Sequence, residues 1–112
     1  MKIVILGYGK MGQMIEKFAL KRGHEIALIV DSENRDGLIA EDLVDADIAI
    51  DFSTPEAALG NISLCFEANL PMVVGTTGWY DHIEEVKETC LEADQSLLYG
   101  SNFSIGVNLF FH

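Results

Sequence analysis

The chain has 112 residues, of which 49% are hydrophobic, and a formal net charge of −11. This length allows one domain at most, and the apolar content is sufficient for a core. The negative charge argues against nucleic acid as a partner, and no apolar run reaches the roughly 18 residues of a membrane span. We therefore expect a cytoplasmic protein with no membrane partner.

The chain begins with a short apolar strand, a glycine-rich loop and an amphipathic helix. The strand is predicted over Lys2–Leu6 and the helix from about Lys10 to Arg22, with Gly23 as its stop. The loop between them reads Gly7-Tyr8-Gly9-Lys10-Met11-Gly12. Its three glycines allow a tight turn, a close approach of the backbone to a diphosphate, and close packing of the helix on the strand.

A second strand is predicted over Glu25–Val30, and Asp31 follows it directly. An acid about 20 residues beyond the glycine loop holds ribose hydroxyls in dinucleotide sites, and the first helix N-terminus favours an anion. The pattern therefore predicts a dinucleotide site. Asp31 would repel a 2′-phosphate, whereas Ser32, Lys10 or Arg35 could accommodate one. We expect NADH or NADPH as the cofactor, with NADH slightly favoured.

The remainder of the chain alternates between predicted strands and helices. Strands over Ile48–Phe52, Met72–Val74 and Ser96–Tyr99 are separated by helices from Pro55 to about Ala68 and from Asp81 to about Ala93. A short helical turn is possible near Glu41–Val44. This order predicts an α/β fold, a doubly wound (Rossmann) parallel sheet with helices on both faces and strand order 3-2-1-4-5. The third strand is expected to be buried on both faces.

Each predicted strand ends in a loop of small and hydroxyl residues. The carboxyl ends of parallel strands meet at one edge of a sheet, where ligands bind. We therefore expect one site built from the loops Gly7–Gly12, Asp31-Ser32, Phe52-Ser53-Thr54, Gly75–Gly78 and Gly100–Ser104.

The sequence offers no convincing catalytic or metal-binding group. His24 begins a strand at the opposite end from the cofactor loops, His82 opens a helix in solvent, and His112 is terminal. Cys65 and Cys90 lie in helical patterns and are predicted to be small buried hydrophobes rather than a disulfide or metal pair.

The last residues are strongly apolar. Leu109, Phe110 and Phe111 have no polar stop after them, and Ser104 has the character of an N-cap for a helix that is then cut off. We infer a fragment that stops where a second domain begins. The alternative is a C-terminal helix that docks its aromatic side chains on the sheet.

The loops resemble those of the 4-hydroxy-tetrahydrodipicolinate reductase family of bacterial lysine and diaminopimelate biosynthesis. The segments that carry this resemblance are Gly7-Tyr8-Gly9-Lys10-Met11-Gly12, Asp51-Phe52-Ser53-Thr54-Pro55-Glu56, Gly75-Thr76-Thr77-Gly78 and Ser101-Asn102-Phe103-Ser104-Ile105-Gly106-Val107-Asn108. The first two occur in many dehydrogenases, and the last two together are much more specific. The resemblance covers residues 1–112 as a dinucleotide-binding domain, which is only one half of that enzyme.

The resemblance implies hydride transfer from NADH or NADPH, with loss of water, to a cyclic dicarboxylate, 4-hydroxy-tetrahydrodipicolinate. Thr77 would also face this substrate. The glycine loop is one residue shorter than the family's common form. The resemblance places the cofactor on Gly7, Tyr8, Gly9, Lys10, Met11, Gly12, Asp31, Phe52, Gly75, Thr76, Thr77, Gly100, Ser101, Asn102 and Phe103.

The family's proton-donating histidine and its lysine partner belong to a motif beyond His112, and so does its substrate-binding and tetramer-forming domain. We therefore expect a homotetrameric parent protein and a chain that binds cofactor without turnover. Two alternatives stay open. One is another two-domain dehydrogenase of the aspartate, homoserine or sugar oxidoreductase type. The other is a standalone NAD-sensing domain that uses Leu109–Phe111 as an interface.

Overall fold

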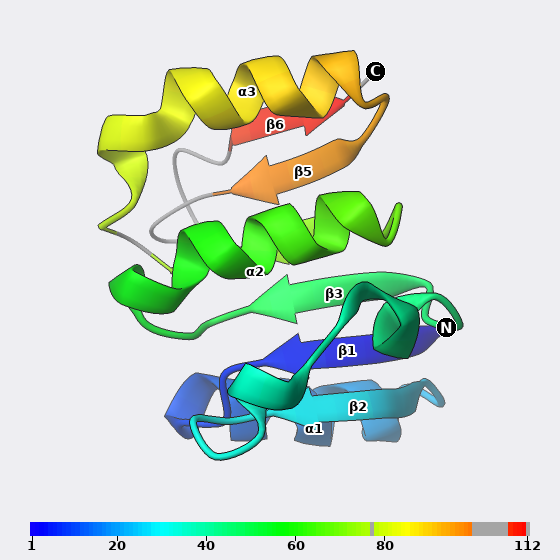
Figure 1. Cartoon of the computed structure of the whole chain (residues 1–112). Helices are drawn as coiled ribbons and strands as arrows, with labels where there is room; N and C mark the ends of the chain where they lie inside the picture. The colour runs from blue at the N-terminus through cyan, green and yellow to red at the C-terminus, as the bar shows by residue number, and fades with distance from the viewer. Residues whose placement is uncertain (77, 100–107, 112) are drawn as a thin grey trace.

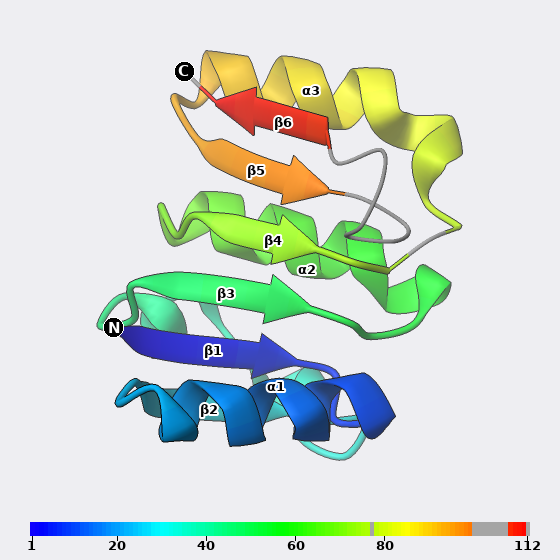
Figure 2. The ribbon, with the colours of Figure 1, turned by 180° about the vertical axis from the view of Figure 1, so that it is seen from behind.

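The computed structural model describes residues 1–76, 78–99 and 108–111. Among these residues a single sheet runs through the molecule in the order β2-β1-β3-β4-β5-β6 (Figures 1 and 2). Its first five strands are parallel: β1 (Lys2–Leu6), β2 (Glu25–Val30), β3 (Ile48–Asp51), β4 (Met72–Val74) and β5 (Ser96–Tyr99). All five agree with the predicted strands to within one residue.

Helices cover both faces of the sheet, which confirms the predicted fold class. Helix α1 (Lys10–Lys21) lies on one face beside β1 and β2, and α2 (Pro55–Glu67) and α3 (Ile83–Glu92) lie on the other (Figure 2). The expected short helical turn is a 3₁₀-helix, η2 (Ala40–Leu43), preceded by another, η1 (Arg35–Gly37). The third predicted helix begins two residues late because its first turn is a 3₁₀-helix, η3 (Tyr80–His82).

The predicted strand order 3-2-1-4-5 is wrong. Strand β3 pairs with β1, on the side opposite β2, so the first five strands follow the order 2-1-3-4-5. The reason lies in the connection from β2 to β3, which crosses β1 and inserts the buried Leu43 into the core beside Val4 and Leu6. Asp47 then fixes the crossing, because its backbone N–H donates to the Lys2 carbonyl at 2.8 Å.

The alternation of side chains along β1 divides the core between the two faces. Val4 and Leu6 belong to the large core beneath α2 and α3, and Ile3 and Ile5 belong to a smaller core beneath α1. Strand β3 was expected to be buried on both faces, but Ile48 and Ile50 on the α1 side are only half-buried. Helix α1 contributes the buried side chain of Ala19 to the smaller core, and Ile15 packs against it while only partly buried.

Helix α2 begins and ends as its sequence predicts. The Thr54 hydroxyl accepts a hydrogen bond from the Ala57 N–H at 3.3 Å, and Pro55 occupies the first helical position. After the helix, Asn69 takes a positive φ of 55°, a conformation that Asn tolerates better than most residues. The buried face of α2 consists of Ala58, Asn61, Ile62, Cys65 and Phe66.

Residues 108–111 form neither the truncated helix nor the docked C-terminal helix that the sequence suggested. They form β6 (Asn108–Phe111), which pairs antiparallel with β5. The outer edge of β5 would otherwise leave its backbone N–H and carbonyl groups without a strand partner, and aromatic residues favour strands. Ser104, the expected cap, lies outside the described residues.

Candidate functional site

The strand order creates a switch point between β1 and β3. The connection after β1 leads to β2 on one side, and chain entering β3 continues to β4 on the other side. Loops therefore diverge at the carboxyl ends of β1 and β3 and leave a crevice between them, which is where ligands bind in open α/β sheets. The loops after β1, β2, β3 and β4 all meet at this edge, as predicted.

The glycine loop is held by close backbone contacts. Gly7 has a φ of +100°, and a Cβ there would lie 2.6 Å from the Phe52 carbonyl oxygen, so the loop after β1 packs directly on the loop after β3. A Cβ at Gly12 would lie 2.1 Å from the Gly7 carbonyl oxygen. Both positions therefore require glycine on steric grounds.

Gly9 differs from Gly7 and Gly12, the other two glycines of the loop, because it faces open space. A Cβ built there would meet no heavy atom within 4 Å. Gly9 is also the N-cap of α1, it has no side chain with which to cap the helix, and the first turn carries no acid. The first N–H groups of α1 are thus free of side-chain caps and suit an anionic group that approaches over Gly9.

The main pocket lies at the ends of β1, β2 and β3 and has a volume of about 440 Å³. Four predicted site residues from these strand ends, together with Asp31, are part of its lining. It also includes residues that the sequence reasoning did not assign as cofactor contacts. The lining consists of Gly7, Tyr8, Gly9, Val30, Asp31, Ser32, Arg35, Phe52, Ser53, Thr54, Ala57 and Asn61.

Asp31 is fixed by the turn that follows it. Its Oδ1 accepts hydrogen bonds from the backbone N–H groups of Glu33 (2.9 Å) and Asn34 (3.1 Å). Asn34 in turn accepts from the Asp31 N–H at 2.8 Å through its own Oδ1. Within the described part of the chain no residue bonds to Asp31 Oδ2, and the side chain is exposed at the pocket. One carboxylate oxygen is therefore available to a ligand hydroxyl.

A second pocket of about 380 Å³ lies beside the first, toward β4. Phe52 lines both pockets, and its ring packs against Gly75, where a Cβ would lie 2.1 Å from the ring. The second pocket adds four predicted site residues, namely Lys10, Met11, Gly75 and Thr76. It shares Gly9 and Ser53 with the main pocket, and Pro55 completes its lining. The two pockets form a continuous stretch of sheet edge from Asp31 to Thr76.

A buried carboxylate joins the loops under this edge. Asp51, at the end of β3, has no exposed surface. Its Oδ1 accepts hydrogen bonds from the Ser53 N–H (2.8 Å), the Ser53 hydroxyl (2.6 Å) and the Thr76 hydroxyl (2.8 Å), and its Oδ2 accepts from Asn61 Nδ2 (3.0 Å). We call Asp51, Ser53, Asn61 and Thr76 the Asp51 cluster. It satisfies a charge that would be very costly to bury alone.

Tyr8 is tied to the first helix. Its hydroxyl donates to a carboxylate oxygen of Glu16 on α1. This hydrogen bond is the main cause that raises the pKa of Tyr8 above its ordinary value, with desolvation and the charge of Glu16 as smaller causes. The Gln13 amide also donates to the Tyr8 carbonyl at 3.3 Å. The residue between the two glycines is therefore held at the pocket wall by α1.

Among the predicted site residues that the structure describes, Gly12 alone lines neither pocket. Gly12 is buried beneath the start of α1, where it serves packing rather than contact with a ligand. Thr77, Gly100, Ser101, Asn102 and Phe103 lie outside the described residues, so their assignment stays a prediction.

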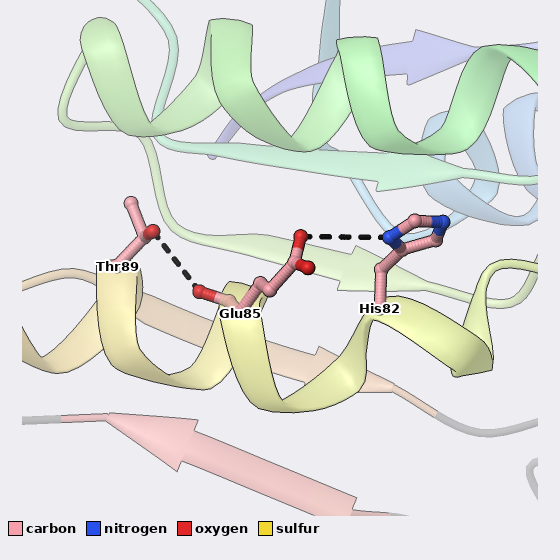
Figure 3. Close-up of polar contacts among 3 residues, drawn as sticks. All are labelled: His82, Glu85 and Thr89. Carbon is pink, nitrogen blue, oxygen red and sulfur yellow. Dashed lines mark hydrogen bonds and ion pairs between the residues drawn. The ribbon is translucent and has the colours of Figure 1, made fainter.

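His24 and His82 lie where the sequence predicted them. His24 Nδ1 contacts the N-terminal ammonium at 3.1 Å, at the amino end of the sheet. His82 lies exposed at the start of α3 and contacts Glu85 at 3.5 Å, while Thr89 donates to the Glu85 carbonyl at 3.0 Å (Figure 3). Such exposed pairs contribute little to stability. Cys65 and Cys90 are buried and are not joined to each other by a disulfide, and the Cys90 thiol donates to the Gln95 carbonyl at 3.3 Å.

Sequence reasoning assigned no site role to three residues that line the main pocket, namely Val30, Ala57 and Asn61. Asn61 had a detectable signal, because it is a polar residue on the otherwise apolar face formed by Ala58, Ile62 and Cys65. Ala57 had none, because alanine is unremarkable in the first turn of any helix. None of the helices that the structure describes is long and apolar enough to span a membrane.

The fold and the glycine-loop edge define a doubly wound α/β domain of the dinucleotide-binding type. The family model described as "Dihydrodipicolinate reductase, N-terminus" matches residues 1–103. The chain belongs to this family, which confirms the resemblance seen in its loops.

Named relatives agree with this assignment. The chain is 47% identical over 113 residues to the 4-hydroxy-tetrahydrodipicolinate reductase of Christiangramia forsetii, with 99% of the chain covered, and 37% identical over 115 residues to that of Staphylococcus carnosus, with 97% covered. It covers 46% of each relative, so it spans about half the length of the curated relatives it matches.

A solved structure shares the fold. It is the dipicolinate-bound dihydrodipicolinate reductase from Paenisporosarcina sp. TG-14, with a TM-score of 0.73 and 21% sequence identity. The match covers 92% of this chain and 48% of that one. This likeness supports the fold of the described domain.

Proposed function

We propose that this chain is the cofactor-binding half of a reductase that converts 4-hydroxy-tetrahydrodipicolinate to tetrahydrodipicolinate in lysine and diaminopimelate biosynthesis. The observation that carries the proposal is the open cradle at Gly9, placed between two pockets at the switch point of the sheet. Membership of the dihydrodipicolinate reductase family supports the reaction class. A bound reduced nicotinamide would supply the hydride.

The two pockets suit the two ends of a dinucleotide. The main pocket, with Asp31 at its rim, is proposed to take the adenosine ribose, and the start of α1 beyond Gly9 is proposed to take the diphosphate. The second pocket, with Gly75 and Thr76, is proposed to take the nicotinamide end. The free Oδ2 of Asp31 supports a preference for NADH over NADPH, because a carboxylate accepts from ribose hydroxyls and repels a 2′-phosphate.

The parts of the site outside the described residues belong to the same proposal. Thr77, Gly100, Ser101, Asn102 and Phe103 are proposed to complete the nicotinamide end, with Thr77 also facing the cyclic dicarboxylate substrate. The acid–base groups, the substrate-binding domain and a homotetrameric, cytoplasmic assembly are proposed for the parent protein. The relatives, of which this chain covers 46%, leave ample length for such a domain.

Titration calorimetry of the chain with NADH and with NADPH tests the binding role. Gly9→Val should weaken binding of both at least tenfold, because the added side chain enters the open space over the start of α1 without meeting other atoms. Gly37→Ala is the matched control, since a Cβ there also meets nothing within 4 Å and Gly37 lies outside both pockets. Absence of binding of either nucleotide to the unaltered chain at millimolar concentration would refute the proposal.

A further inference from the structure

Asn61 occupies an unusual place for its residue type. It lies inside helix α2, is 1% exposed, and shares its face with the apolar residues Ala58, Ile62 and Cys65. Asparagine is a weak helix former, and a buried amide is costly unless its hydrogen bonds are made. The sequence therefore keeps a residue here that neither helix formation nor apolar packing favours.

The hydrogen bonds of Asn61 use both ends of its amide. Its Oδ1 accepts from Arg35 Nε at 2.5 Å, and its Nδ2 donates to Asp51 Oδ2 at 3.0 Å and to the Ser53 hydroxyl at 3.2 Å. Both N–H donors of the amide are thereby satisfied. An amide is suited to this place because it accepts from a guanidinium and donates to a carboxylate at once.

The Arg35 end of this chain of hydrogen bonds lies in the main pocket. Arg35 comes from η1 and reaches across to α2, where a Cβ at Gly60 would lie 3.3 Å from its Nη2. The small residue at position 60 and the amide at position 61 together fix the guanidinium against the helix. Arg35 and Asp31 are lining residues of the same pocket that carry formal charge.

The other end reaches the second pocket and a tryptophan. Asp51 Oδ1 holds the Thr76 hydroxyl at 2.8 Å, and the Thr76 carbonyl accepts from the indole N–H of Trp79 at 2.7 Å. Trp79 is 1% exposed and is the single tryptophan of the sequence. Its fluorescence therefore reports on the position of the loop after β4.

We propose that Asn61 is a positioning residue of the dinucleotide site, which joins Arg35 in the main pocket to Asp51 and Thr76 in the second pocket and so holds the two ends of the site at one spacing. The inference rests on the proposed function, since it assigns both pockets to one nucleotide. Asn61 itself acts through its neighbours, because the contacts it makes hold Arg35, Ser53 and Asp51 in place.

The first test replaces the amide by an apolar group of similar size. In Asn61→Leu, the dissociation constants for NADH and NADPH, measured by calorimetry, should rise about tenfold, and the Trp79 emission of the ligand-free protein should shift because the Thr76 carbonyl loses its fixed place. The far-UV circular dichroism spectrum of the variant shows whether it is folded, and only folded protein is titrated. Ser63→Ala, on the exposed side of the same helix, is the control and should change neither quantity.

The second test does not depend on the leucine variant folding. Asn61→Asp keeps the size of the side chain but sets a second carboxylate against Asp51. A shared proton restores the missing donor at low pH, so the loss of NADH affinity relative to the unaltered protein should be several-fold larger at pH 8 than at pH 5. The charged and titratable neighbours are Asp51 on β3, Arg35 on η1 and Cys65 on α2, and burial and the charge of Asp51 raise the pKa of Cys65 to about 12, so its thiol stays neutral in this range.

The outcomes separate the two proposals. If the unaltered chain binds neither nucleotide, the proposed function fails. If it binds, but folded Asn61→Leu keeps both dissociation constants and the Trp79 emission unchanged, or the affinity loss of Asn61→Asp is the same at both pH values, the positioning role of Asn61 is wrong.

Discussion

Asp31 is held in one orientation by the chain that follows it. Both turn bonds go to Oδ1, and no described residue bonds to Oδ2, so this oxygen of a pocket-lining residue is available to a ligand. The sequence predicted the position of this acid from its spacing after the glycine loop. It did not predict that Oδ1 accepts both turn hydrogen bonds and leaves Oδ2 to a ligand, because that depends on the conformation of residues 31–34.

Asp31→Asn separates the charge of this residue from its role in the turn. The amide oxygen can still accept the two backbone hydrogen bonds, while the repulsion of a 2′-phosphate is lost. NADPH affinity should rise about tenfold relative to NADH affinity, a change of about 1.4 kcal/mol in relative binding free energy. Calorimetric titration of both nucleotides measures this ratio, and an unchanged ratio would remove Asp31 from the selection of cofactor.

Cys65 makes the folded state sensitive to alkaline pH. Burial is the largest cause that raises the pKa of its thiol from 9.0 to about 12, the charge of Asp51 raises it further, and Arg35 opposes the shift. In the unfolded chain the thiol loses its proton at lower pH than in the folded chain. The stabilisation is therefore complete below pH 9 and is lost as pH rises toward 12, up to about 4 kcal/mol in total.

Cys65→Ala removes the titrating thiol, and its smaller side chain also lowers the unfolding free energy at every pH. Urea unfolding at pH 8 and at pH 10.5 should show a smaller pH-dependent loss of unfolding free energy in Cys65→Ala than in the unaltered chain. Equal losses in the two proteins would show that the pKa of the thiol is the same in the folded and unfolded states, and that burial does not raise it.

Individual elements were predictable where local signals and burial agree. Strand β2 (Glu25–Val30) and helix α2 match their predictions closely because an apolar run, an N-cap and a proline mark their limits. Strand β6 was missed because its conformation depends on the free edge of β5, which is a tertiary feature. The crossing of β1 by residues 31–47 was missed because it depends on the burial of Leu43, and the weak pattern of this segment does not show which of its apolar residues enters the core.

The N-cap of α2 is a stabilising element at the edge of the main pocket. Thr54→Ala removes the side-chain acceptor for the Ala57 N–H, while the backbone carbonyl at position 54 is kept, and should lower the unfolding free energy by about 1 kcal/mol. Ser63→Ala in the same helix should change it by no more than about 0.5 kcal/mol. Urea unfolding measures both, and a loss in Thr54→Ala no larger than in Ser63→Ala would contradict the capping role.

The described residues form one sheet with a core on each face, and the loops at the carboxyl ends of its parallel strands form the ligand edge. Sequence reasoning reached this architecture because alternating strands and helices leave few topologies. It reached the ligand edge because the carboxyl ends of parallel strands coincide. The contacts beneath that edge, such as those of Asp51 and Asn61, bring together residues from separate elements and could not be found from local patterns.

Nucleotide binding should stabilise the molecule as a single unit. Trp79 lies in the large core, whereas far-UV circular dichroism reports on all helices and strands, so the two signals should lose their native values at the same temperature. NADH at one hundred times its dissociation constant should add about 2.7 kcal/mol to the unfolding free energy. The midpoint temperatures of both signals should therefore rise together. A rise in the midpoint temperature of only one signal would show that the two cores unfold separately.

The central place of β1 also has a kinetic consequence. Strand β1 pairs with β2 on one side and with β3 on the other, and Gly7 is held both by the Val30 carbonyl and by its packing on Phe52. Each of these parallel pairings closes a long stretch of chain, which raises the contact order and slows folding. The glycine cradle therefore acquires its shape only when Gly7 and Phe52, about 45 positions apart, have met, although its three glycines lie within one short loop.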